Sequence, residues 1–138
     1  AILFPFAGPR TEEAWIKGCQ DEGIDVIVGG KMTHEGFDSA SGGSISSLSS
    51  LLIYRRAAEM NVTKFVMPPD DYNFYQSVCD DLRDYTKEKP TIFSPGFGAQ
   101  GCKTNKYTDV PIIGRAICGT PDSKGATLEW YTKLFKEK

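Results

Sequence analysis

Two segments near the C-terminus contain the residue types of a phosphate-binding site. Residues 93–101 read Phe-Ser-Pro-Gly-Phe-Gly-Ala-Gln-Gly, and residues 112–117 read Ile-Ile-Gly-Arg-Ala-Ile. Glycines allow a backbone to approach an anion closely, Gln100 offers an amide, and the Arg115 guanidinium can grip a phosphate with two hydrogen bonds. In both segments these residues follow an apolar run typical of a strand. We therefore predict that the two junctions together form a phosphate clamp.

The same residues admit other interpretations. Gly96, Gly98 and Gly101 match the GxGxxG pattern of dinucleotide-binding loops, but such a loop leads into a helix. No helical pattern follows Gly101, so the sequence disfavours a dinucleotide. For Arg115 the alternative is a salt-bridged residue at the rim of the fold, and the neighbouring glycine loop favours the phosphate.

Other candidates for chemistry receive less support. Lys31 follows an apolar run directly, and we favour a rim charge over a catalytic amine. His34 has no evident orienting partner, which disfavours a general base. The four cysteines are isolated and there is a single histidine, so no zinc-binding set is present. The sequence predicts neither a metal nor a cofactor.

Apolar, β-branched runs alternate with amphipathic patterns along the chain. Such alternation predicts a parallel sheet with right-handed crossovers, and the short strands suit a (β/α)8 barrel as well as an open doubly wound sheet. Five strands are too few to close a barrel. The opening residues resemble the end of a buried strand, so the chain is expected to begin inside a fold. The predicted strands cover residues 1–6, 25–30, 64–67, 91–94 and 110–113, and the predicted helices cover 11–23, 48–60, 72–87 and about 128–135.

Composition limits the class of protein. With 138 residues, 40% of them hydrophobic and 25% charged, residues 1–138 are expected to form a single domain. The net charge of −2 gives no reason to expect nucleic-acid binding. No apolar run approaches the ~20 residues of a membrane span, so no membrane association is expected. Isolated cysteines are typical of the reducing cytoplasm, which is the predicted location.

Four segments, in order, resemble the archaeal-type orotidine 5'-monophosphate decarboxylases. They are residues 32–36 (Met-Thr-His-Glu-Gly), 61–68, 94–101 and 112–117. The resemblance runs from about residue 4 to the C-terminus. It implies an α/β fold of the (β/α)8 TIM-barrel type, of which this chain supplies about the C-terminal half: the end of strand four and strands five to eight. The implied reaction converts orotidine 5'-monophosphate (OMP) to UMP and CO₂ in pyrimidine nucleotide synthesis, without metal or cofactor.

The resemblance also implies roles for individual residues at the phosphate. Gln100 and Arg115 match side chains that bind the substrate 5'-phosphate, assisted by the backbone amides of Gly114 and Arg115. Cys102 stands where a second Gly is usual, and residues 103–109 form a differently built loop.

At the other end of the substrate, Thr33 matches a family Ser that hydrogen-bonds the pyrimidine. Thr keeps the hydroxyl and adds a methyl. Pro95 and Phe97 match the loop that closes over the nucleotide. Glu35 departs from the family, which usually has Pro at this position.

In the family, the catalytic Lys and Asp residues lie on strands two and three, and a further residue is donated by the other subunit of a dimer. The resemblance therefore implies no catalytic residue in this chain, which alone should be inactive. The expected partners are an N-terminal half-barrel or a second copy, in a homodimer. Two alternatives stay open: a Mg²⁺-dependent lyase of the ketohexulose-phosphate decarboxylase/synthase type, and a non-catalytic half-barrel that binds a phosphorylated ligand or a partner protein.

Overall fold

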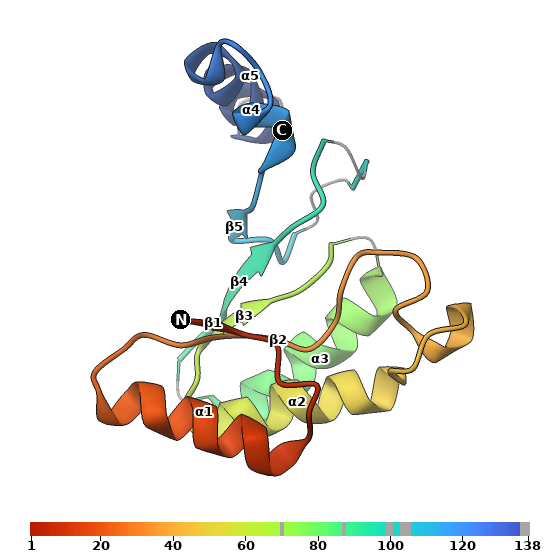
Figure 1. Cartoon of the computed structure of the whole chain (residues 1–138), viewed down its shortest axis with the longest axis vertical. Helices are drawn as coiled ribbons and strands as arrows, with labels where there is room; N and C mark the ends of the chain where they lie inside the picture. The colour runs from red at the N-terminus through yellow and green to blue at the C-terminus, as the bar shows by residue number, and fades with distance from the viewer. Residues whose placement is uncertain (70, 87, 99–100, 103–105, 136–138) are drawn as a thin grey trace.

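The computed structural model shows a parallel sheet with helices (Figure 1) and describes residues 1–69, 71–86, 88–98, 101–102 and 106–135. The five strands lie in the order β1-β2-β3-β4-β5, so each strand pairs with the one before it in the chain. A doubly wound sheet would reverse this order at a switch point. The sequential order is that of a barrel segment. The strands are β1 (Ile2–Leu3), β2 (Ile27–Gly29), β3 (Lys64–Val66), β4 (Thr91–Ser94) and β5 (Val110–Pro111).

The helices follow the predicted alternation, with one addition. The short α4, directly after β5, was not predicted, because four residues are too few to show a helical period. Serine and aspartate side chains cap two of the helices: Ser46 accepts from Ser49 N at 3.0 Å, and Asp71 accepts from Phe74 N at 3.1 Å. The helices are α1 (Pro9–Asp21), α2 (Ser47–Glu59), α3 (Tyr72–Tyr85), α4 (Arg115–Cys118) and α5 (Ser123–Phe135), with a 3₁₀ turn η1 at Ser39–Ser41.

The core lies between the sheet and α1, α2 and α3, which cover one face of it (Figure 1). Val28, Phe65 and Ile92 occupy neighbouring register positions on β2, β3 and β4 and are all buried. Alternate residues of a strand point to opposite faces, so this row of side chains faces the helices. Tyr54 of α2 is fully buried against it, with its ring 6.0 Å from that of Phe65.

The last two helices extend away from this core, as Figure 1 shows beyond β5. The predicted apolar face of α5 is largely exposed: Leu134 is buried, whereas Leu128, Tyr131 and Phe135 are more than half exposed. In a (β/α)8 barrel the helices form a ring around the strands, whereas α5 leaves this apolar face exposed in the structure. In the described part of the chain, no helix is both long enough and apolar enough to cross a membrane.

Candidate functional site

The candidate site lies at the carboxyl edge of the sheet. All four strand pairs are parallel, so the residues that follow each strand gather at one edge, where ligands bind in α/β barrels. Thr33 follows β2, Pro95 and Phe97 follow β4, and Gly114 with Arg115 follows β5. Gln100 lies outside the described residues, and its role stays a prediction.

The loop after β4 turns sharply at its glycines. Gly96, Gly98 and Gly101 have φ angles of 102°, 82° and 72°, a region that side chains other than glycine rarely adopt. Gly101 N donates to Gly98 O at 2.9 Å, and Cys102 N donates to Gly96 O at 3.1 Å. The glycines of the GxGxxG pattern therefore close the loop, and no helix begins in the described residues between the pattern and Gly114, which are 102 and 106–113.

This loop packs against the start of the C-terminal helices. A Cβ added at Gly98 would lie only 2.7 Å from the Cβ of Ala116 and 3.3 Å from Cζ2 of Trp130. Ala116 is the neighbour of Arg115 in α4, and Gly114 caps that helix. The close approach at Gly98 thus brings this residue near the Gly-Arg junction. That the two segments together bind a phosphate stays a prediction. Both Gly114 and Arg115 are exposed.

Pro95 and Phe97 lie in the same loop with different exposure. Pro95 is half-buried, whereas the Phe97 side chain is only 5% exposed. Phe97 therefore packs within the protein in this conformation. Its predicted contact with a ligand stays a prediction.

A buried polar cluster that was not predicted from the sequence lies at the start of this loop. Ser94, at the end of β4, is fully buried. Its Oγ accepts from Thr108 Oγ1 at 3.1 Å and lies 3.3 Å from the Tyr75 hydroxyl. Burial raises the pKa of the Tyr75 phenol above its ordinary value of 10, so the hydroxyl keeps its proton. The cluster joins α3, the end of β4 and the loop between β4 and β5.

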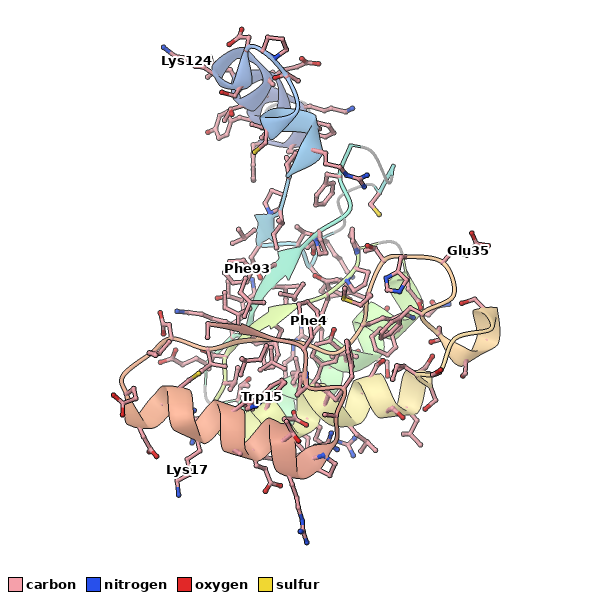
Figure 2. All side chains as sticks on the ribbon, in the orientation of Figure 1. Phe4, Trp15, Lys17, Glu35, Phe93 and Lys124 are labelled. Carbon is pink, nitrogen blue, oxygen red and sulfur yellow. The ribbon has the colours of Figure 1, made fainter. Side chains whose placement is uncertain are left out.

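Thr33 lies in the long loop between β2 and α2. Its side chain is half-buried, and His34 beside it is exposed, with its ring edge-on to Phe37 at 5.6 Å between centroids. Glu35 lies at the outer end of this loop (Figure 2). β2 and β5 are three strand spacings apart, or about 14 Å at 4.8 Å per spacing. A ligand that extends from the end of β2 to the end of β5 would therefore be elongated.

Lys31 precedes Thr33, and its amine is paired with carboxylates, as expected of a rim charge. Lys31 Nζ lies 2.6 Å from Asp71 Oδ2 and 3.8 Å from Asp38 Oδ2. These partners lie 7 and 40 residues away along the chain, and their pairing with Lys31 was not predicted from the sequence. The cap position of Asp71, before the helical pattern of α3, is the one local signal for that carboxylate. Within the described ranges, His, Cys, Asp and Glu side chains form no group of three placed to hold a metal ion.

Comparison with known sequences identifies homologues of this chain. It is 27% identical over 140 residues to a curated protein named orotidine 5'-phosphate decarboxylase from Methanosarcina mazei, covering 99% of this chain and 60% of that relative. It is 32% identical over 120 residues to the protein of the same name from Methanosarcina barkeri, covering 84% of this chain and 50% of the relative. No protein-family model matches the sequence. The resemblance predicted from the four segments is confirmed.

Comparison with solved structures identifies the fold. A crystal structure of orotidine 5'-monophosphate decarboxylase from Methanocaldococcus jannaschii, complexed with inhibitor BMP, matches with a TM-score of 0.75 and 19% identity, over 97% of this chain and 60% of that one. The enzyme from Pyrococcus horikoshii matches with a TM-score of 0.67 and 23% identity, over 96% of this chain and 59% of that one. The fold is therefore that of the decarboxylase TIM barrel, and this chain spans about 60% of it.

Proposed function

We propose that this chain, whose homologues are orotidine 5'-phosphate decarboxylases, is the part of such an enzyme that binds the phosphate and the pyrimidine of OMP. The observation that supports the proposal is the close approach of Gly98 to Ala116, the residue that follows Arg115 in α4. The homology and the barrel fold support the same reaction, the release of CO₂ from OMP to give UMP.

The phosphate would bind between the glycine loop and the Gly-Arg junction. The Arg115 side chain is exposed and carries a permanent charge in a planar fork that matches phosphate oxygens. Gly114 has no side chain to block approach to the backbone amides that follow it. By the family resemblance, Gln100 would add an amide donor. The clamp thus combines one full positive charge with several neutral donors.

The pyrimidine would lie toward β2. Thr33 offers a hydroxyl that can donate or accept a hydrogen bond with a base, and the spacing of about 14 Å between β2 and β5 separates it from the phosphate. By resemblance, Pro95 and Phe97 would line the nucleotide between these two ends. The order base, ribose, phosphate then runs across the carboxyl edge from β2 to β5.

The groups that act on the carboxylate of OMP would come from the rest of the barrel. A (β/α)8 barrel has eight strands, and the described sheet has five. We propose that an N-terminal half-barrel or a second copy of the chain supplies the remainder, in a cytoplasmic homodimer. Exposed apolar side chains lie on the two outer strands, Ile2 on β1 and Val110 on β5, and on α5, at Leu128, Tyr131 and Phe135.

Binding of UMP tests the proposal in what we call the completed barrel: this chain joined to the part of the Methanosarcina mazei relative that it does not match. Arg115→Ala should weaken UMP binding by about 1.5–3 kcal/mol, the range for a hydrogen bond to a charged group. The matched control is Arg83→Ala, because Arg83 is exposed, pairs with Asp80, and lies near the end of α3, away from the carboxyl edge.

Isothermal titration of UMP into the three proteins gives the answer. The proposal predicts saturable binding by the completed barrel, weaker binding by Arg115→Ala and unchanged binding by Arg83→Ala. Equal affinity of the two arginine variants would contradict the assignment of Arg115. Failure of the folded completed barrel to bind UMP would contradict the proposed function itself.

A further inference from the structure

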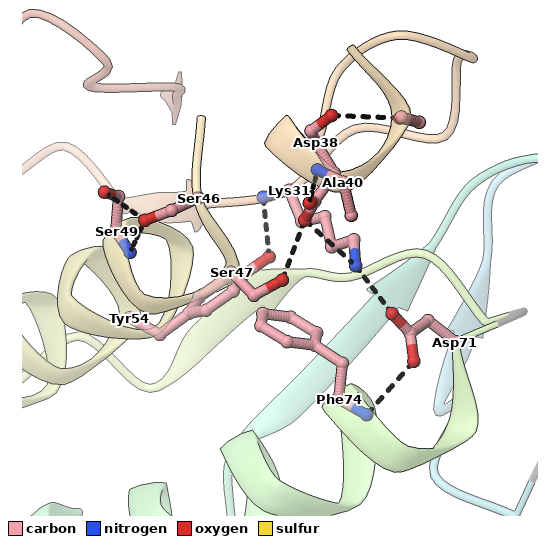
Figure 3. A network of polar contacts seen from close by, with 10 residues as sticks. Lys31, Asp38, Ala40, Ser46, Ser47, Ser49, Tyr54, Asp71 and Phe74 are labelled. Carbon is pink, nitrogen blue, oxygen red and sulfur yellow. Dashed lines mark hydrogen bonds and ion pairs between the residues drawn. The ribbon is translucent and has the colours of Figure 1, made fainter. Parts of the chain in front are cut away.

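Lys31 is the centre of a polar network at the start of the β2–α2 loop (Figure 3). Its side chain is only 12% exposed. The amine lies 2.6 Å from Asp71 Oδ2 and 3.8 Å from Asp38 Oδ2, and 4.4 Å above the ring of Phe74. Two carboxylates and an aromatic face surround the amine, so Lys31 is engaged by the protein itself.

One of the two carboxylates lies within the β2–α2 loop and the other at the start of α3. Asp71 caps α3 by accepting from Phe74 N. Asp38 lies within the loop, where Oδ1 accepts from Ala40 N at 2.9 Å and Oδ2 accepts from Ser47 Oγ at 2.8 Å. Through Asp38 the amine of Lys31 is connected to the middle of the loop and to the start of α2. Through Asp71 it is connected to the helix that follows β3.

The backbone of Lys31 is also held, by a hydrogen bond to a buried side chain. Lys31 N donates to the Tyr54 hydroxyl at 3.1 Å, and that hydroxyl donates to Val66 O at 2.7 Å. Tyr54 is fully buried, and burial raises the pKa of its phenol, so it keeps the proton that it donates. The end of β2 is thereby tied to α2 and to the end of β3.

Thr33 lies between the two fixed points of the loop, Lys31 and Asp38. A loop whose ends are held in place presents its intervening side chains with little freedom. We infer that Lys31 is a positioning residue: its ion pairs with Asp38 and Asp71 hold the loop so that the Thr33 hydroxyl meets the pyrimidine. This inference rests on the proposed function, because it needs Thr33 to contact a base.

The closing experiment compares two ligands, UMP and ribose 5-phosphate, which share the phosphate and ribose and differ in the base. In the completed barrel, Lys31→Met should weaken UMP binding by about three- to tenfold, the loss expected for one neutral hydrogen bond. Ribose 5-phosphate binding should not change. The matched control is Lys64→Met, because Lys64 also pairs with an aspartate, Asp25, at 2.7 Å but lies at the start of β3.

A double mutant tests whether Lys31 acts through Thr33. In a Thr33→Val background, Lys31→Met should cause no further loss of UMP affinity, since the hydroxyl that it positions is gone. Asp38→Asn is a second route to the same result if Lys31→Met fails to fold, because it weakens the ion pair and keeps an acceptor for Ala40 N. Lys31→Arg, which keeps the charge, should retain UMP affinity.

The outcomes of these binding experiments distinguish the positioning role of Lys31 from the proposed function. An unchanged UMP affinity in Lys31→Met, an equal loss for both ligands, or an additive loss in the Thr33→Val background would overturn the positioning role and leave the proposed function intact. A wild-type completed barrel that does not bind UMP would overturn the proposed function and, with it, the role of Thr33.

Amide hydrogen exchange on the chain tests, without any ligand, whether Lys31 holds the β2–α2 loop in place. Ala40, Ser41 and Gly43 donate their amides to Asp38, and these amides should exchange faster in Lys31→Met than in the wild type. Amides of α1 should exchange at the same rate in both proteins, and Lys64→Met should match the wild type in the loop. An unchanged rate at the three loop amides would show that Lys31 does not hold the loop.

Discussion

Replacing Gly98 by alanine tests the contact that joins the two halves of the phosphate clamp. The φ angle of 82° at this position costs an alanine about 1–2 kcal/mol. The new methyl would also lie 2.7 Å from the Cβ of Ala116, about 1 Å inside the 3.5–4.0 Å optimum for two carbons. Forcing such a contact apart typically costs about 1–3 kcal/mol. Gly98→Ala should therefore destabilise the chain by about 2–5 kcal/mol.

Gly101→Ala is the matched control. Its φ angle of 72° imposes a similar backbone cost, and no described atom lies within 4 Å of an added Cβ. Urea denaturation should show a loss of about 1–2 kcal/mol for Gly101→Ala and a larger loss for Gly98→Ala. In an Ala116→Gly background the loss caused by Gly98→Ala should shrink, because the crowded methyl is gone.

The two glycine variants should also differ in their affinity for UMP. In the completed barrel, Gly98→Ala should lower UMP affinity, because the loop must move away from α4 and therefore from Arg115. Equal destabilisation by Gly98→Ala and Gly101→Ala, with no recovery in the Ala116→Gly background, would refute the reasoning that the contact with Ala116 places the loop.

Two further predictions concern buried ionisable groups. The fully buried Glu12 carboxylate accepts from Arg56 Nε at 2.7 Å, but burial raises the pKa of Glu12 above its ordinary 4.5, so the folded chain holds the proton more tightly than the unfolded one. The free energy of unfolding should accordingly fall relative to that of Glu12→Gln as pH rises from 4.5 through the folded pKa; parallel pH profiles in urea denaturation would contradict this. Burial raises the pKa of Cys79 to about 11, whereas Cys118 is exposed, so iodoacetamide at pH 8 should modify Cys118 first, as read by peptide mass spectrometry; faster labelling of Cys79 would argue against its burial.

The order of the elements could be predicted because their signals are local. The apolar runs at β2, β3 and β4 and the helical spacing of α2 and α3 are visible within windows of a few residues, and alternation of the two patterns predicts parallel pairing. The glycines of the β4 loop were likewise identified by type, and their positive φ angles explain why glycine is needed there.

Contacts between distant segments could not be predicted in the same way. The pairing of Lys31 with Asp71 and the approach of Gly98 to Ala116 depend on how the crossovers place strand ends side by side. The apolar face of α5 was predicted from spacing, but spacing does not tell what covers it. In the described residues Leu128 and Tyr131 are exposed.

Decarboxylation of OMP, followed by the loss of substrate absorbance, tests whether this chain forms part of an OMP decarboxylase site. The assay compares this chain alone, the completed barrel, and the completed barrel with Arg115→Ala. We predict turnover by the completed barrel, a marked loss with Arg115→Ala, and none by the chain alone, because the catalytic groups would lie in the added segment. A folded completed barrel without turnover, or turnover indifferent to Arg115, would contradict the account.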